Sequence, residues 1–146
     1  MKKHSLLTLF NLIFLLNWAS CQELITWKTL EDVSFTDKYS DELASYIMIP
    51  TFGDNLHALE GKEVLIKGFV IPLDVSLNLY VLSANPYASC FFCGGAGPET
   101  VMDIVFAEKQ KFRTDEYVTL KGRLKLNADD VYKLNYILED AEIVKK

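Results

Sequence analysis

Residues 118–126 alternate strictly between apolar and polar side chains. Successive side chains of a β-strand point to opposite faces of the sheet, so this alternation predicts a strand with one buried face. Residues 64–71 carry a similar hydrophobic-Lys-Gly pattern, and each run has a glycine near its middle, Gly68 in one and Gly122 in the other. A central glycine lets a long strand bend sharply, as the strands of a small barrel must.

Three further runs are predicted to be strands: residues 78–83, 101–106 and 131–144. The segment Asn127-Ala128-Asp129-Asp130 has the composition of a turn, because Asn and Asp tolerate tight turns and bond their own backbone. Five strands, with glycine in the first and fourth, predict an all-β fold, a small five-stranded OB-like Greek-key barrel. Only residues 107–116 join the third strand to the fourth, which leaves little room for the helix usual there, and a β-sandwich is the alternative.

The first residues predict export from the cytoplasm. Lys2 and Lys3 form a short positive region, residues 6–16 are an apolar run, and small residues follow at Ala19-Ser20-Cys21, which is the layout of a signal peptide. The apolar run is shorter than the roughly 18 residues that span a bilayer. A signal peptide over residues 1–21 would release a soluble protein into the periplasm. A lipoprotein signal over residues 1–20 would leave Cys21 to be acylated and anchored at the cell envelope.

Residues 22–146 suit one domain with a modest core. We expect residues 59–146 to form the barrel and residues 22–58 to form an N-terminal extension packed on it. Removing Lys2 and Lys3 from the 15 basic residues leaves 13 against 20 acidic residues, a net charge of −7. An acidic surface repels phosphate backbones, so nucleic acid is not an expected partner.

Cys90 and Cys93 lie three positions apart in Cys-Phe-Phe-Cys-Gly-Gly, and they are the only cysteines after residue 21. They belong to residues 85–100, an irregular connection of the kind that is often functional in compact domains. The glycines of the following Gly-Gly-Ala-Gly run are predicted to take positive φ and to fold the backbone closely around the sulfurs, with amide N–H groups free to point at a thiolate. The loop is therefore expected to hold the two thiols in a defined place.

Three interpretations of this cysteine pair stay open. As metal ligands, the two thiolates form half of a zinc-knuckle site, and further ligands would come from His57, Glu99, Asp103, a second subunit or water. As a redox pair they would exchange a disulfide with other thiols, although the Trp-Cys-Gly-Pro pattern and βαβ context of thioredoxin-like enzymes are missing. As a structural element they would form a static disulfide in an oxidising compartment. Taken alone, the histidine and the two carboxylates are more typical of surface residues.

The run Gly68-Phe69-Val70-Ile71-Pro72-Leu73, followed by a strand and then Cys90, resembles a family of small exported bacterial domains of unknown function. The resemblance covers roughly residues 59–143. In that family a G-F-x-x-P-L strand precedes a cysteine-histidine-polyproline motif, whereas here Cys93-Gly94-Gly95 stands in place of the histidine and prolines. Residues 80–99 are also similar to envelope proteins of the Bacteroidetes group. The resemblance implies export, a barrel-like fold and a metal-linked envelope role beside transport systems.

The sequence as a whole predicts an exported envelope binding module that binds a transition metal such as zinc through Cys90 and Cys93. The alternatives are a thiol-disulfide exchange protein and a structural envelope protein with a static disulfide and a protein-binding barrel face. An envelope protein or a metal transport protein is the expected partner, and a lipid anchor at Cys21 is the one expected membrane contact. No Ser-His-Asp grouping, G-x-x-x-x-G-K loop or H-E-x-x-H pattern points to an enzyme.

Overall fold

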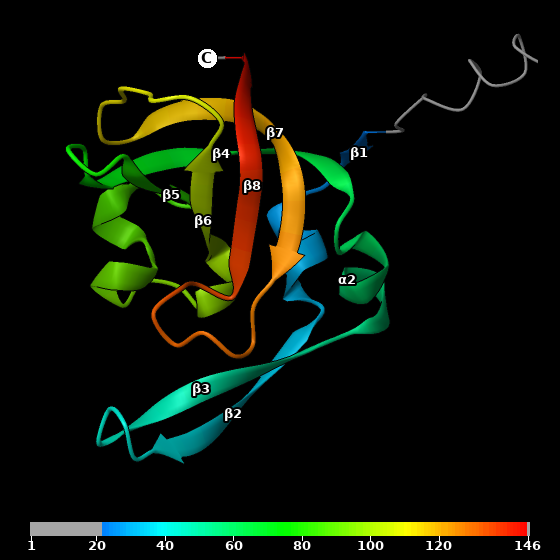
Figure 1. Cartoon of the computed structure of the whole chain (residues 1–146), viewed down its shortest axis with the longest axis vertical. Helices are drawn as coiled ribbons and strands as arrows, with labels where there is room; N and C mark the ends of the chain where they lie inside the picture. The colour runs from blue at the N-terminus through cyan, green and yellow to red at the C-terminus, as the bar shows by residue number, and fades with distance from the viewer. Residues whose placement is uncertain (1–21, 146) are drawn as a thin grey trace, which may run out of the picture.

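The computed structural model describes residues 22–145, so the predicted signal peptide and Cys21 lie outside the described residues. Five strands form a barrel (Figure 1): β4 (Glu63–Asp74), β5 (Leu79–Ser83), β6 (Val101–Phe106), β7 (Glu116–Leu126) and β8 (Tyr136–Lys145). None of the helices among residues 22–145 is long and apolar enough to cross a membrane.

The order of the barrel strands is a Greek key. β4 pairs antiparallel with β5, and β5 pairs antiparallel with β6. β6 then pairs parallel with β8, β8 pairs antiparallel with β7, and β7 returns to pair with β4. The predicted all-β, OB-like barrel is therefore confirmed. A β-sandwich is ruled out because the pairing of β7 with β4 closes the sheet on itself.

Gly68 and Gly122 lie on the two strands that close the barrel, where β4 pairs with β7. A Cβ atom added at Gly68 would come within 2.7 Å of the Ser83 carbonyl oxygen. One added at Gly122 would come within 2.7 Å of the Leu138 side chain. These distances are shorter than ordinary contacts, so close packing against the neighbouring strand requires glycine at both positions.

The last strand begins later than the sequence pattern predicts. β8 starts at Tyr136, and residues 127–135 form a loop instead of a tight turn and a strand. The Asn127 side chain holds this loop together, because its amide donates to the carbonyls of Asp130 at 2.9 Å and Leu134 at 3.1 Å. The side chain of Tyr132 is consequently 74% exposed, and the predicted strand position of this residue is wrong.

The core fills the barrel and includes residues from the segment that precedes it. Strand residues such as Val64, Leu82 and Leu120 are fully buried, and so are Leu30 and Leu56 from the N-terminal segment. The buried Tyr136 hydroxyl donates a 2.7 Å hydrogen bond to the Leu30 carbonyl and so joins β8 to that segment.

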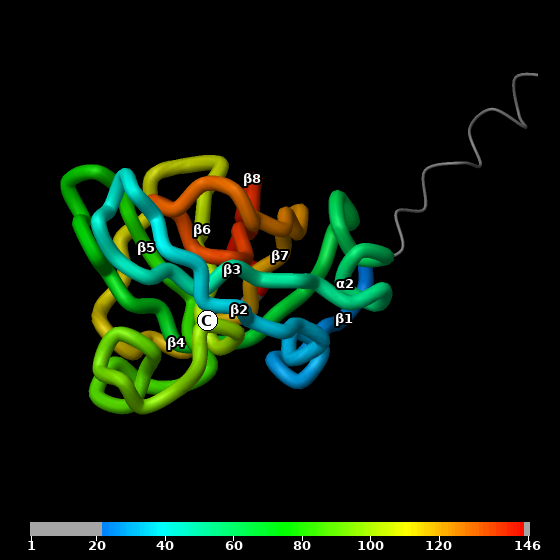
Figure 2. Tube along the Cα trace, turned by 90° about the horizontal axis from the view of Figure 1, so that it is seen from below, coloured from blue at the N-terminus to red at the C-terminus, as the bar shows by residue number. Residues whose placement is uncertain are grey.

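Residues 22–59 contain two parts with different surroundings. The elements are β1 (Glu23–Leu24), η1 (Trp27–Glu31), β2 (Val33–Ser40), β3 (Ser45–Phe52) and α2 (Asp54–Leu59). β1 pairs parallel with β4, and the Trp27 indole donates a 2.7 Å hydrogen bond to the Lys67 carbonyl. β2 and β3 form a separate two-stranded hairpin, here called the arm, which extends beneath the barrel in Figure 1 and crosses its lower end in Figure 2. β3 passes through Pro50 and continues to Phe52.

Candidate functional site

The cysteines lie in the loop of residues 84–100 that joins β5 to β6. The loop contains three short 3-10 turns, η2 (Tyr87–Ser89), η3 (Phe91–Cys93) and η4 (Pro98–Thr100). Its two ends are tied together by a 2.9 Å hydrogen bond from the Ala84 N–H to the Thr100 carbonyl. Its middle is tied to the start of β7 by a 2.7 Å hydrogen bond from the Tyr87 N–H to the Asp115 carboxylate. We call this segment the thiol loop.

Two glycines allow the chain to turn tightly after Cys93. Gly94 adopts the left-handed conformation with φ of 72°, and its N–H donates to the Phe91 carbonyl at 2.9 Å. The Gly95 N–H donates to the Cys90 carbonyl at 3.2 Å, so neither amide is free to point at a thiolate, contrary to the prediction. Of the three glycines predicted to have positive φ in this loop, Gly94 alone has it.

The two thiols have different environments. Cys90 is fully buried and packs with Ile71, Val81 and Val101 in a small cluster separate from the main core. Cys93 is exposed, and its thiol donates to the Tyr87 carbonyl at 3.2 Å. Both cysteines are free thiols. The structure therefore places one sulfur inside the protein and the other at its surface, on the same short turn.

The pKa of the Cys93 thiol is raised above the usual value for cysteine. The main cause is partial removal of its sulfur from water, followed by the charge of Cys90 and a hydrogen bond with the Cys90 thiol. A raised pKa leaves less thiolate at neutral pH, which disfavours Cys93 as a nucleophile in disulfide exchange.

His57, the first of the three additional metal ligands suggested by sequence, is exposed on α2. Its ring lies edge-on to Phe52 with 6.3 Å between ring centroids, and its Nδ1 is 3.9 Å from the Glu60 carboxylate. His57 therefore contacts the base of the arm and its own helix.

The two carboxylates suggested as ligands also have other neighbours. Asp103 lies on β6, accepts a 2.9 Å hydrogen bond from the Leu134 N–H, and has a pKa raised mainly by burial. Glu99 lies in η4, and its charge adds to the burial that raises the pKa of Tyr136. Among residues 22–145, no group of three or more His, Cys, Asp or Glu side chains is arranged to hold a metal ion. In this part of the chain the structure therefore does not join His57, Glu99 or Asp103 to the two cysteines in such a group.

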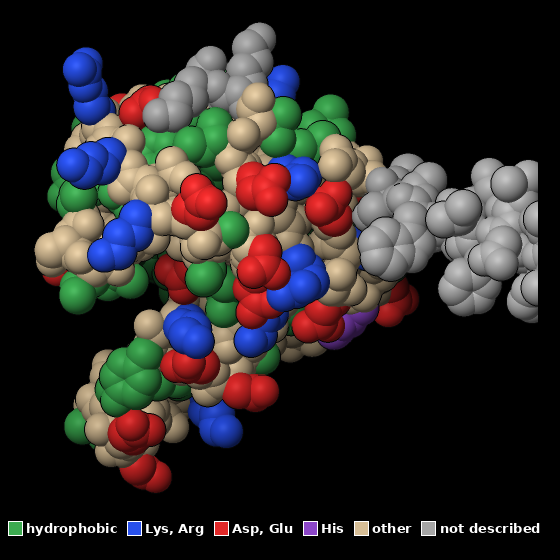
Figure 3. Space-filling model, turned by 45° about the horizontal axis from the view of Figure 1, so that its top comes forward, with side chains coloured by type: hydrophobic (Ala, Val, Ile, Leu, Met, Phe, Trp, Pro, Cys, Tyr) green, Lys and Arg blue, Asp and Glu red, His purple; other side chains and the backbone are tan. Residues whose placement is uncertain are grey.

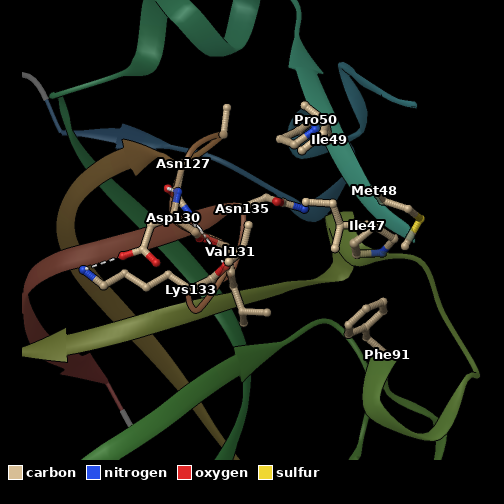
Figure 4. Close-up of a pocket in the computed structure, with 13 residues that line it drawn as sticks. Ile47, Met48, Ile49, Pro50, Phe91, Asn127, Asp130, Val131, Lys133 and Asn135 are labelled. Carbon is tan, nitrogen blue, oxygen red and sulfur yellow. Dashed lines mark hydrogen bonds and ion pairs between the residues drawn. The ribbon is translucent and has the colours of Figure 1, made fainter. Parts of the chain in front are cut away.

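A groove of about 200 Å³ opens beside the thiol loop. One wall is residues 47–50 of β3, the other is the 127–135 loop, and Phe91 and Pro98 come from the thiol loop. In Figure 4 the Phe91 side chain points from its loop toward the arm. Phe91 follows Cys90 directly in the chain, so the groove borders the turn that carries the cysteines.

Sequence pattern alone does not reveal this groove, because its walls come from segments far apart in the chain. Residues 127–130 have the composition of a turn between strands, and residues 46–50 belong to the segment predicted to precede the barrel. The one available signal was the apolar run Tyr46-Ile47-Met48-Ile49-Pro50 in a segment that the barrel does not need. A run of this kind indicates burial but does not identify what it packs against.

Comparisons with known proteins identify a similar fold. No family model and no curated protein matches the chain. The crystal structure of a DUF3299 family protein from Pseudomonas aeruginosa is similar, with a TM-score of 0.53 and 14% sequence identity over 86% of this chain and 98% of that chain. At this identity the likeness shows a shared fold. This likeness supports the resemblance to a family of small uncharacterised domains. It gives no information about the variant with Cys-x-x-Cys-Gly-Gly.

Proposed function

We propose that this chain is an exported binding module of the cell envelope that binds a soft transition-metal ion through Cys90 and Cys93. The observation that carries the proposal is the pair of free thiols at the two ends of one short turn, with Cys93 open to solvent. Thiolates are preferred ligands of zinc and of monovalent copper. Both cysteines belong to the same turn, because the Cys93 N–H donates to the Cys90 carbonyl at 3.1 Å across η3.

The donor set decides how each ion would be held. Structural zinc sites are almost always four-coordinate, and residues 22–145 provide two sulfurs here. A zinc ion would therefore take its other ligands from water, a small molecule or a partner protein. Monovalent copper is satisfied by fewer ligands and is selected by soft sulfur donors. A site left open in this way suits transfer of metal to or from a metal transport protein in the envelope.

A static disulfide is the second candidate, and a specific observation favours it. One turn of backbone joins the two cysteines, with the Cys93 N–H bonded to the Cys90 carbonyl at 3.1 Å, and in an oxidising compartment such a pair of free thiols can close. The disulfide would hold the thiol loop in place and leave the barrel face to bind another protein. Disulfide exchange with other proteins has less support, because Cys90 is buried and the pKa of Cys93 is raised.

Metal content and thiol state, measured on the full chain purified from cell envelopes without chelator or reductant, test these alternatives. We expect stoichiometric zinc or copper in the wild type and its loss in Cys90→Ser and Cys93→Ser. The control variants His57→Ala and Glu99→Gln should keep the metal. Since thiols release protons when they bind a metal, the affinity should rise with pH. Metal-free protein whose cysteines resist alkylation until reduced would contradict metal binding and support the disulfide.

A further inference from the structure

The outer edge of the arm borders the groove beside the thiol loop. Residues 47–50 of β3 line one wall in succession, so side chains from both faces of the strand reach the groove. A groove bounded by one face alone would be lined by alternate residues. No residue of β2, the strand that pairs with β3, lines the groove. The groove therefore lies along the edge of β3 that is turned away from β2, here called the free edge.

The backbone at the free edge is unpaired. Within the described part of the chain, residues 47–50 make no hydrogen bond outside the ladder with β2. The N–H and C=O groups of successive strand residues point to opposite edges, so those directed at the groove have no partner in this part of the chain. Pro50 lacks an N–H and limits pairing to the residues before it. An extended peptide presents backbone groups at the spacing that completes such an edge.

The arm is held at both ends, so the free edge has a fixed position beside the groove. At the base of the arm, Phe52 packs on Tyr136 with 5.7 Å between ring centroids. At its tip, the Glu42 carboxylate accepts a 2.9 Å hydrogen bond from the Tyr132 hydroxyl. A two-stranded hairpin alone is marginally stable in water, and a third strand stabilises it.

The groove offers apolar walls and one amide side chain. Figure 4 shows Ile47 and Ile49 of β3 across the groove from Val131 and Asn135. The side-chain amide of Asn135 makes no hydrogen bond with any other residue in the range 22–145. An amide side chain both donates and accepts, as a peptide group does, so Asn135 matches the backbone of an extended ligand.

The surroundings of the groove are acidic. Residues 37–42 of the arm and residues 127–133 of the facing loop carry five carboxylates and two lysines, a net charge of −3. One of these lysines, Lys133, is already paired with Asp130 at 3.6 Å. Figure 3 shows Asp and Glu side chains near the tip of the arm, at the lower left. This excess of negative charge attracts a ligand that carries Lys or Arg and repels an acidic one.

We propose that the groove binds an extended segment of a partner protein, which adds a third strand at the free edge of β3. The segment has apolar residues that enter the groove and Lys or Arg beside them. Backbone hydrogen bonds supply affinity in this mode of recognition, and the pockets for side chains supply specificity. This proposal does not depend on the metal site.

Nuclear magnetic resonance of the isotopically labelled full chain, titrated with synthetic peptides, tests the proposal. The probe is acetyl-Lys-Val-Thr-Val-Thr-Val-Lys-amide at millimolar concentration. We expect its binding to shift the amide signals of residues 46–49 and 131–135. Replacement of both Lys residues of the peptide by Glu should weaken binding about tenfold. Absence of shifts at residues 46–49, or equal binding of the basic and acidic peptides, would overturn the proposal.

Two N-methylated peptides test whether the ligand pairs as a strand. One is methylated on the three Val nitrogens and the other on the two Thr nitrogens, so the two lose donors at opposite edges. Only one of the two methylations should abolish binding. A peptide held by its side chains alone would respond equally to both, and this outcome would contradict the addition of a strand.

A matched pair of variants tests the location. Val131 lines the groove and is 38% exposed, whereas Val75 is 51% exposed on the β4–β5 turn. Val131→Lys should weaken binding of the basic peptide about tenfold, because it places a positive charge and a longer side chain at the groove. Val75→Lys should leave it unchanged. Circular dichroism and thermal unfolding check that both variants are folded, and equal affinities of the two variants would refute the assignment to this groove.

Discussion

Replacing Cys90 with serine tests the unequal burial of the two thiols. Cys90 is 0% exposed among aliphatic side chains, so a serine hydroxyl there would be removed from water with no partner prepared for it. Burying an unpaired hydroxyl costs about 1–3 kcal/mol of unfolding free energy. Cys93 is exposed, and its replacement by serine should change stability by less than about 0.5 kcal/mol. Under reducing conditions the two substitutions are therefore expected to differ strongly.

Under oxidising conditions a disulfide between Cys90 and Cys93 would add a second contribution to the free energy of unfolding, and both serine variants would lose it equally. Closing a ring as short as the one between Cys90 and Cys93 restricts the unfolded chain and stabilises the fold by about 2 kcal/mol in the chain-entropy description. Either serine variant removes that contribution completely. The wild type should consequently lose stability when reductant is added, whereas neither variant should respond to it.

Urea unfolding with a chelator present, followed by the fluorescence of Trp27, measures both contributions. Trp27 is a suitable reporter because its indole is bonded to the Lys67 carbonyl of β4. With a slope of about 1–3 kcal/mol per molar urea, Cys90→Ser should lower the midpoint by about 1 M in reductant. Equal midpoints for the two variants in reductant would refute the burial of Cys90. A wild-type midpoint that ignores reductant would refute the disulfide.

Three further predictions concern the scaffold. Tyr136→Phe should cost about 1–2 kcal/mol in chemical denaturation, because it leaves the buried Leu30 carbonyl unpaired. The exposed Tyr132→Phe is its control, and equal effects would contradict the assignment. Gly122→Ala should destabilise by about 1–3 kcal/mol, since the new Cβ meets a side chain at 2.7 Å, and an unchanged melting temperature would disprove this crowding. The Asp74 carboxylate accepts hydrogen bonds from the Ser76 and Leu77 N–H groups, which lower its pKa in the folded state. Asp74→Asn should therefore be less stable than wild type above about pH 4, and the difference should vanish as the pH falls through the lowered pKa of the folded state. A stability difference that instead widens in acid would show that folding does not lower the pKa of Asp74.

Local sequence pattern was a good guide to the barrel strands. The strand predicted at 101–106 matches β6, and the alternation over 118–126 lies within β7. Both runs have apolar side chains at the positions that face the core, so the residue types indicate directly which positions are buried. The pattern failed at 131–135, where Tyr132 and Leu134 continue the alternation. There the hydrogen bonds of Asn127 hold a loop, and no local period shows which residue will accept them.

The thiol loop was predictable in position but not in environment. The spacing of Cys90 and Cys93 placed both on one turn, and a Gly in the left-handed conformation follows them. The opposite burial of the two sulfurs depends on Ile71, Val81 and Val101, which come from three different strands. The same limit applies to His57, Glu99 and Asp103, because whether they join the cysteines depends on where separate elements pack.

The sequence by itself determined an all-β chain, the positions of most barrel strands along it, and the two glycines that let the closing strands approach. Periodicity and backbone geometry are local properties, and they act the same way wherever the segment lies. The tertiary structure alone decided that one thiol is buried, that Phe91 faces the arm, and that the β4–β5 turn contacts the loop between β6 and β7. These are contacts between segments distant in the chain, and only packing brings them together.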